Sequence, residues 1–223
     1  GIGPRDEVGR IGVTLVQDLP AVGARLLDHP GTAIFLRPRI GSGFSFEAPL
    51  IQTVLRYASG ERAHTSDMLL QPGSRITLPK FDLPLFGLMC SVGKPRGTGT
   101  LHWPSADVRA RPVIASRLLE DASDRALAVH AMHMARDLVH TKALRPFVAH
   151  LWPSERVLRD RVRTDAWIRS ACDSGYHPSG TVPMGPEGDP NAATDGRGRG
   201  RGVTGLSVGD WILMPTIPSS NIH

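Results

Sequence analysis

The residue pattern with the clearest chemical meaning lies near the end of the chain, around His177. It reads Tyr176-His177-Pro178-Ser179-Gly180-Thr181-Val182-Pro183-Met184-Gly185. A histidine that precedes a proline, between glycine-containing turns, sits on a fixed, non-helical backbone. Because the pKa of imidazole lies near neutrality, such a side chain can accept or donate a proton in a reaction. On this pattern alone, the simpler interpretation is a loop histidine that only hydrogen-bonds locally.

Two further segments have residue types that suit a ligand site. The segment from Asp210 to Asn221 joins a carboxylate to a loop that Pro215 and Pro218 stiffen, so it could present backbone groups to a cofactor. The same segment is compatible with an edge strand and a turn. The second segment is the glycine-containing loop from Val22 to Pro30, which ends in Asp28-His29-Pro30.

Taken in order, these segments resemble the C-terminal part of the glucose–methanol–choline (GMC) family of flavoprotein oxidoreductases. The family strings H-P-S-G-T-x-x-M-G, D-A-S-x-M-P-T-x-P-S-G-N and V-G-x-N-L-x-D-H are similar to His177–Gly185, Asp210–Asn221 and Val22–His29. Gly1–Pro4 resembles the end of the family's second signature, and Pro95-Arg96-Gly97 and Thr194–Leu206 also have counterparts. The resemblance extends over essentially the whole chain and is densest at its two ends.

The resemblance implies oxidation of a CH–OH group to an aldehyde or ketone, with hydride transfer to FAD. It matches His177 with the family's catalytic histidine, as base or proton acceptor, and Asn221 with a second catalytic position that hydrogen-bonds the substrate oxygen. The positions that match residues lining the flavin are Asp28, His29, Asp210, Trp211, Pro215, Thr216 and Pro218. The expected partners are a small-molecule alcohol and an N-terminal FAD domain of the same polypeptide, outside this sequence. Without that domain, the chain is expected to bind FAD poorly and not to turn over.

The chain departs from the family strings at a few positions. Arg25 stands where the family usually has Asn, and Val182-Pro183 replaces the common Cys-Arg. Neither change touches His177 or Asn221. The departures therefore bear on packing and cofactor affinity more than on the type of reaction.

An Arg-Gly run from Gly196 to Gly202 supports a competing hypothesis, a cofactor-free binding module. Such a module would be a degenerate GMC domain or an Arg-Gly-type RNA binder. The run is short, has no interleaved aromatic residues and continues into an apolar segment, so we expect no nucleic-acid partner. The G-x-G-x-x-G at Gly200, Gly202 and Gly205 precedes a strand-like segment, whereas a dinucleotide fingerprint opens a helix, so we interpret it as a chance match.

The histidines of the central region do not predict a metal site. His130 and His133 are three residues apart on an expected helix, and His140 follows seven residues later. Two imidazoles at this spacing can share a metal ion, but no carboxylate motif or third convergent ligand accompanies them.

The elements that must position these residues are predicted by composition and periodicity. The 223 residues are 40% hydrophobic and carry a formal net charge of +5, with three lysines and otherwise arginines among the 26 basic residues. No apolar run is long enough to span a membrane. The two cysteines are too few for a disulfide framework, which indicates a cytoplasmic protein.

Short apolar runs separated by glycine and proline over residues 32–101 predict a largely antiparallel sheet, for which we expect about six strands. These runs are Ala33–Leu36, Ile51–Tyr57, Met68–Gln71, Leu85–Val92 and Thr98–Trp103. A short helix over Asp6–Ile11 and a strand over Val13–Gln17 precede them. From residue 116 the apolar period becomes helical, which predicts one helix with a buried face comprising Leu127, His130, Ala131, Met134, Leu138 and Val139. A second helix is predicted over Ser154–Ala171, with Ser154 as its N-cap.

Strands followed by helices indicate an α+β fold with helices on one face of the sheet. We expect three parts: residues 1–30 return to the FAD domain, residues 31–174 form the substrate-binding domain, and residues 175–223 form the active-site and flavin-lining segment.

Overall fold

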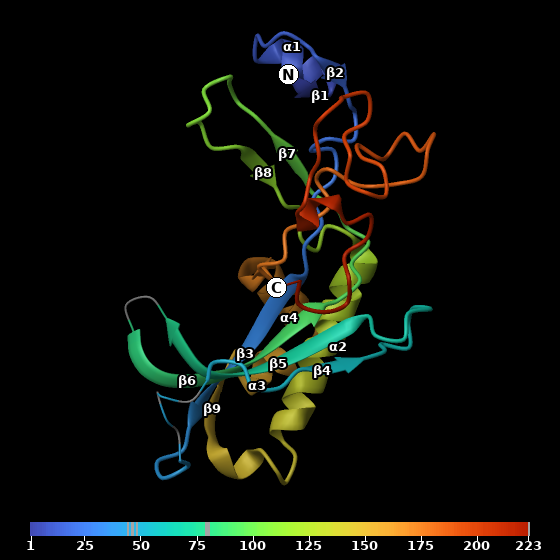
Figure 1. Ribbon diagram of the computed structural model, residues 1–223. Coiled ribbons are helices and arrows are strands. Elements are labelled where there is room, and N and C mark those ends of the chain that lie inside the picture. Colours follow the sequence, from blue (N-terminus) through green and yellow to red (C-terminus); the bar gives the residue numbers. More distant parts are fainter. Residues whose placement is uncertain (44, 46, 48, 79–80, 223) are drawn as a thin grey trace. The chain divides into compact units, whose positions relative to one another are not determined.

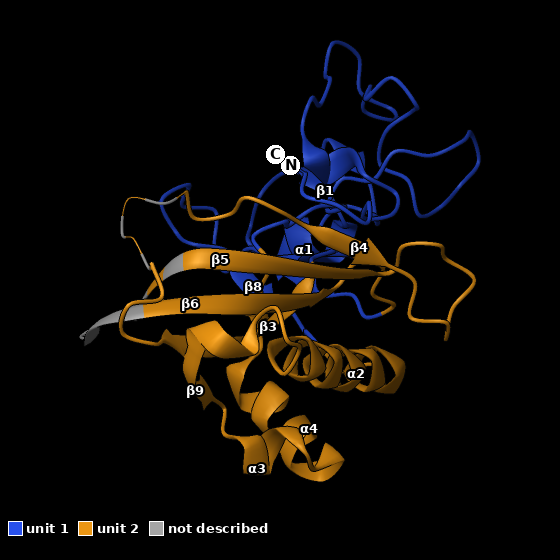
Figure 2. Cartoon of the chain, turned by 90° about the horizontal axis from the view of Figure 1, so that it is seen from below, with its two compact units in different colours: residues 1–28, 97–118, 176–223 blue, residues 29–96, 119–175 orange. Residues whose placement is uncertain are grey.

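Segments that are far apart in the sequence associate into two units. The computed structural model describes residues 1–43, 45, 47, 49–78 and 81–222 (Figure 1). Unit 1 comprises residues 1–28, 97–118 and 176–223, and unit 2 comprises residues 29–96 and 119–175 (Figure 2). The last of the three predicted parts thus lies in unit 1 with the beginning of the chain and with residues 97–118.

Unit 2 contains an antiparallel sheet of six strands, which confirms the predicted fold class. The strands are β3 (Pro30–Pro38), β4 (Leu55–Tyr57), β5 (Met68–Leu78), β6 (Phe81–Val92), β9 (Val148–Trp152) and β10 (Asp173–Ser174). Their order is β10-β3-β6-β5-β4, and β9 also pairs with β3. In the register of β3 with β6, Ile34 lies opposite Leu88. Directly opposed residues of neighbouring strands share a face, so alternate apolar positions build one continuous apolar surface.

Helix α2 (Ala122–Val139) covers that apolar surface (Figure 1). Its buried residues include Leu127, Ala131 and Val139, as predicted, while Met134 and Leu138 are half-buried against the same core. The buried face is wider than predicted and also includes Ala128, Val129, Met132 and Ala135.

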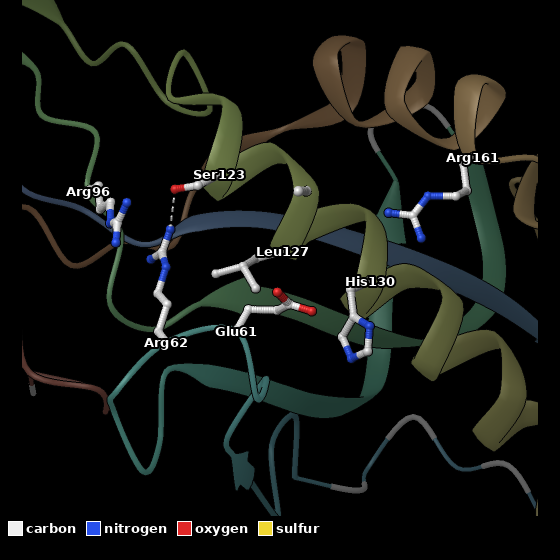
Figure 3. A pocket seen from close by; sticks show the side chains of 8 residues that line it. Glu61, Arg62, Arg96, Ser123, Leu127, His130 and Arg161 are labelled. Atoms are coloured by element: carbon white, nitrogen blue, oxygen red, sulfur yellow. Dashed lines mark hydrogen bonds between the residues drawn. The ribbon is translucent and has the colours of Figure 1, made fainter.

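The prediction that His130 lies on the buried face of this helix is wrong. His130 is exposed and lines a cavity of about 300 Å³ in unit 2 (Figure 3). The alanines of α2 are small and let the helix approach the sheet closely. The side of the helix that carries them therefore faces the sheet, and His130 lies outside the core.

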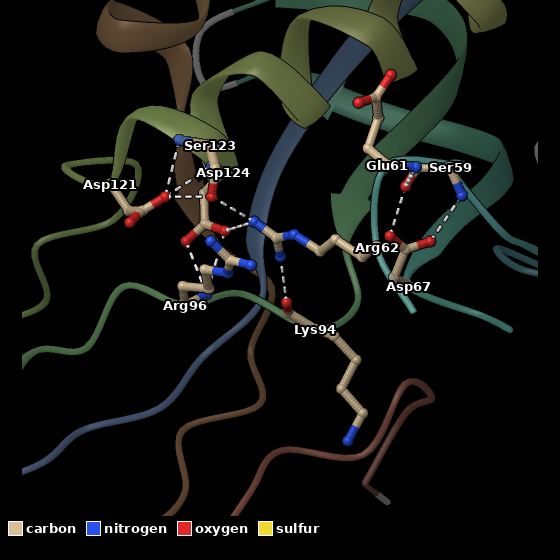
Figure 4. A network of polar contacts seen from close by, with 9 residues as sticks. All are labelled: Ser59, Glu61, Arg62, Asp67, Lys94, Arg96, Asp121, Ser123 and Asp124. Atoms are coloured by element: carbon tan, nitrogen blue, oxygen red, sulfur yellow. Dashed lines mark hydrogen bonds and ion pairs between the residues drawn. The ribbon is translucent and has the colours of Figure 1, made fainter. Parts of the chain in front are cut away.

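The first turn of α2 carries a buried ion pair. Asp121 caps the helix by accepting hydrogen bonds from the backbone N–H groups of Ser123 and Asp124. Asp124 is 1% exposed, and one of its carboxylate oxygens lies 2.6 Å from a guanidinium nitrogen of Arg62 (Figure 4). The pair joins the loop before β5 to the helix.

The predicted second helix is in fact two helices. They are α3 (Glu155–Leu158) and α4 (Arg161–Ala171), and a short 3₁₀ turn, η1 (Arg145–Phe147), precedes β9. Asp160 interrupts the helix because its side chain accepts hydrogen bonds from the N–H groups of Val162 and Arg163, which makes it the N-cap of α4. Ser154 occupies the N-cap position of α3 but makes no side-chain capping bond.

Glu155, in the first turn of α3, is the centre of a surface ion-pair cluster. Its carboxylate accepts hydrogen bonds from Arg136 and Arg159 and contacts His140. Burial alone would raise the pKa of Glu155, but the hydrogen bonds from His140, Arg136 and Arg159 lower it to about 2. A carboxyl group whose pKa is lower in the folded chain than its ordinary 4.5 stabilises the fold above that pH.

We therefore expect Glu155→Gln to lower the free energy of unfolding at pH 7 by about 1 kcal/mol, after allowance for solvent screening. The loss should shrink as the pH falls from 4.5 toward 2, where the wild-type carboxyl group also becomes protonated. Urea unfolding at a series of pH values measures the difference. The exposed Glu120 provides the control, because Glu120→Gln should have little effect at any pH. A loss for Glu155→Gln that does not change with pH would contradict the electrostatic explanation.

Unit 1 has short elements connected by turns. They are β1 (Ile2–Gly3), α1 (Arg5–Arg10), β2 (Gln17–Asp18), β7 (Thr100–His102), β8 (Val113–Ala115) and the 3₁₀ turn η2 (Trp211–Leu213). The predicted helix near residue 6 is confirmed. The predicted strand over Val13–Gln17 is wrong in extent, because only Gln17–Asp18 pairs, in parallel with β1. Among the described residues, no helix is long and apolar enough to cross a membrane.

Candidate functional site

His177 lies in unit 1 with its backbone held by a carboxylate. Its N–H donates a hydrogen bond to Asp28 Oδ1 at 3.1 Å, across 149 positions of the sequence. Asp28 and His177 are 8% and 6% exposed. The preceding residue, Tyr176, has a φ of +62°, which turns the chain sharply before the histidine. The imidazole is thus carried on a constrained backbone, as the sequence predicts.

The loop after His177 is attached to its neighbours on two sides. On one side Ser179 and Leu27 exchange backbone hydrogen bonds, each 2.9 Å long. On the other side the N–H groups of Gly180, Val182 and Met184 donate in turn to the carbonyl groups of Trp211, Ile212 and Leu213.

Gly180 is required where these two attachments meet. Its φ is +76°, and a β-carbon there would lie 2.8 Å from Leu27 Cδ1 and 3.2 Å from the Met214 carbonyl oxygen. The close approach brings the Val22–Asp28 loop, the His177 loop and the Asp210–Asn221 segment together.

The Asp210–Asn221 segment presents an exposed edge. Asp210 caps η2 through a hydrogen bond from Ile212 N–H. Arg25 anchors the following loop by donating to the Pro215 carbonyl oxygen at 2.6 Å. Of the residues predicted to line a flavin, Asp210, Trp211, Pro215 and Thr216 are exposed, and Pro218 is half-buried.

The structure brings some of the predicted site residues together and leaves others apart. His177 and Asp28 are in direct contact. His29 belongs to unit 2, where it is fully buried and its carbonyl accepts a hydrogen bond from Gly175 N–H. Asn221 is exposed on the last part of unit 1, and its action beside His177 stays a prediction.

Two residues that depart from the family strings have structural roles here. Arg25, in place of Asn, makes the contact with Pro215 described above. Val182, in place of Cys, packs against the small core of Leu19, Ala21 and Ala193 in unit 1. The sequence marks both positions as unusual, but their partners are too distant in the chain to be recognised from it.

The Arg-Gly run is folded into turns. Asp195 accepts hydrogen bonds from the N–H groups of Arg197 and Arg199, while the Arg201 side chain donates to the carbonyl groups of Gly185, Pro186 and Asp189. At Gly198 φ is +75°, and a β-carbon would lie 2.4 Å from the Val208 carbonyl oxygen. Glycine is therefore needed at position 198 for this turn. The run does not form the disordered arm that RNA binding of this type requires.

The three histidines considered as metal ligands have separate surroundings. His130 lines the cavity on α2, His133 lies 3.2 Å from Thr164 Oγ1, and His140 contacts Glu155. No group of three or more potential metal-ligating side chains occurs in the part of the chain that the structure describes.

The residues around the His177 loop fit the FAD that the resemblance implies. Ser179 Oγ and Ser219 Oγ are buried and have no hydrogen-bond partner among the described residues. Buried hydroxyl groups are normally satisfied, so these two suit contacts with a bound polar group. Beside them, Trp211 and the Pro215 loop offer exposed apolar surface and backbone groups, which a flavin ring and its polar edge require.

Comparison with known proteins identifies the family. The family model described as GMC oxidoreductase matches residues 95–223. A GMC-type oxidoreductase of Rhodococcus erythropolis is 31% identical over 231 residues, and an oxygen-dependent choline dehydrogenase of Stenotrophomonas maltophilia is 25% identical over 249 residues. Both alignments cover 100% of this chain but only 43% and 44% of the relatives. The chain thus spans less than half the length of these relatives.

Solved structures agree in fold. Pyridoxine 4-oxidase from Mesorbium loti superposes with a TM-score of 0.83 and 22% identity, covering 100% of this chain and 44% of that protein. Formate oxidase superposes with a TM-score of 0.86 and 18% identity, covering 99% of this chain and 48% of that protein. The matched family model, together with these folds, shows that the chain belongs to the GMC oxidoreductase family and corresponds to its C-terminal portion.

Proposed function

We propose that this chain supplies the substrate-binding and proton-transfer half of an FAD-dependent alcohol oxidoreductase. The observation that carries the proposal is the buried His177, whose backbone N–H is bonded to Asp28 on a loop anchored at both sides. An imidazole on a rigid support keeps its orientation during proton transfer. The family membership adds the expectation of flavin chemistry, and two of the relatives named above, a choline dehydrogenase and a pyridoxine 4-oxidase, suggest a hydroxyl-bearing substrate.

His177 accepts the hydroxyl proton of the substrate, and Asn221 donates a hydrogen bond to the same oxygen. Removal of this proton and of a hydride from the adjacent carbon converts the alcohol to an aldehyde or ketone. FAD, when bound, supplies the two-electron acceptor for that hydride. Asp210, Trp211, Pro215, Thr216 and Pro218 would hold the flavin from this chain, together with Asp28 of the same unit.

The two buried serines, Ser179 and Ser219, would contribute binding rather than proton transfer. Ser179 Oγ and Ser219 Oγ can each donate one hydrogen bond to a flavin or substrate oxygen. Arg25, through its contact with the Pro215 carbonyl, would keep the flavin-facing loop in place.

The test is to express this chain together with the coding region upstream of Gly1, where that region encodes a strand, a glycine-rich turn and a helix. The longer protein should copurify with FAD, and an alcohol from a panel of choline, pyridoxine and an aryl alcohol should bleach the flavin absorbance without air. The 223-residue chain alone should show no stoichiometric flavin absorbance. A flavin-containing protein that no alcohol in the panel reduces would contradict the assignment to alcohol oxidation.

A further inference from the structure

The cavity on α2 is separate from the residues assigned to flavin and proton transfer. All of its lining residues belong to unit 2, and its volume of about 300 Å³ suits a small organic molecule. The lining comprises Glu61, Arg62, Arg96, Ser123, Ala126, Leu127, His130 and Arg161.

Positive charge dominates this lining. Three guanidinium groups face one carboxylate, that of Glu61. The charge of Arg62 is balanced by Asp124, 2.6 Å away, but no ion pair within the described residues engages the side chains of Arg96 or Arg161. Two guanidinium groups are therefore available to a ligand.

The charge of Arg161 acts on the neighbouring helix. Burial is the largest cause that lowers the pKa of His133 on α2, and the positive charge of Arg161 is the next. Arg161 thus lies close enough to α2 for its charge to act on a side chain of that helix.

The two available arginines lie at opposite ends of the cavity. In Figure 3, Arg62 and Arg96 are on one side, Arg161 is on the other, and Leu127, Glu61 and His130 lie between them. Ala126 and Leu127 give the middle of the cavity an apolar wall. Glu61 makes the same region unfavourable for a further negative charge.

We propose that this cavity binds a small dicarboxylate. One carboxylate pairs with Arg96 and the other with Arg161, because guanidinium and carboxylate groups match in charge and in hydrogen-bond geometry. The carbon chain between them packs on Leu127. Buried Arg62, fixed by Asp124 and by the Lys94 carbonyl oxygen, forms the wall behind Arg96.

The experiment uses the purified chain and glutarate as the probe. Glutarate should bind saturably in isothermal titration calorimetry and raise the unfolding temperature, since a ligand of the folded state stabilises it. Butyrate, at matched ionic strength, should bind at least about tenfold more weakly because it has only one carboxylate. Arg96→Gln and Arg161→Gln should each weaken glutarate binding at least about tenfold.

Arg156, an exposed arginine on α3 outside the cavity, provides the matched control. Arg156→Gln removes the same charge and should leave glutarate affinity unchanged. Equal losses in all three variants would mean attraction to the overall positive charge and would overturn the proposal. The absence of saturable glutarate binding by the folded wild-type chain would overturn it as well. Neither outcome affects the proposed flavin chemistry, since His177 and Asn221 are not changed.

Discussion

Replacement of His177 by glutamine is expected to lower kcat about 10²- to 10⁴-fold in a flavin-containing protein that carries this chain. Glutamine preserves much of the side-chain volume and a hydrogen-bonding end, but it cannot take up the hydroxyl proton. The backbone contact with Asp28 does not involve the side chain of residue 177, so the loop should keep its position. Steady-state kinetics together with the flavin content of the purified variant separate lost chemistry from lost structure.

The control for this prediction is a histidine outside the site. His150 is exposed on β9 in unit 2, so His150→Gln should leave kcat and flavin content unchanged. The dependence of kcat on pH supplies a second readout. A variant without the proton acceptor should lose the part of this dependence that comes from the ionisation of the acceptor. If His177→Gln retains flavin and nearly full kcat, His177 is not the proton acceptor.

The second large effect concerns stability. Asp124→Ala is expected to lower the free energy of unfolding by about 3–5 kcal/mol, because it leaves the cation of Arg62 buried without a partner. The side chain of Arg62 is only 6% exposed. The change also removes the acceptor of the Arg96 backbone N–H, 2.9 Å from Asp124 Oδ2 (Figure 4). Urea unfolding with linear extrapolation gives the difference.

Asp137 provides a control on the same helix. Its ion pair with Arg136 is on the surface and its side chain is 71% exposed, so Asp137→Ala should cost at most about 1 kcal/mol. Asp124→Asn keeps an acceptor while it removes the charge, and it should give an intermediate loss if Asp124→Ala does not fold. The role of the buried pair is disproved if Asp124→Ala loses no more stability than Asp137→Ala.

The fold could be predicted where local pattern and tertiary packing agree. The helical spacing of the apolar residues after position 116 predicted α2, and apolar runs bounded by glycine and proline predicted β3, β5 and β6. Prediction failed where a single side chain or a distant partner decides the outcome. Asp160 divides α3 from α4 by capping the second helix, and the alanines of α2 turn the helix so that His130 lies outside the core.

The candidate site was predicted as a set of segments rather than as a geometry. Family strings identify His177 and the Val22–His29 loop, but no periodicity indicates that Asp28 holds the His177 backbone across 149 positions. Arg25 appears in the sequence only as a departure, although it anchors the Pro215 loop. The roles of Asn221 and of the flavin-lining residues stay predictions.

The interleaved composition of the two units has a consequence for the order of folding during synthesis. The β5–β6 hairpin has all its residues once the ribosome has passed residue 92, and β3 can join it then. Unit 1 must wait for residues 176–223, because residues 1–28 pack with a segment that is translated only after all of unit 2. At a synthesis rate of roughly 5–20 residues per second, residues 1–28 stay without these partners for on the order of ten seconds or more. During this interval residues 1–28 are open to a chaperone.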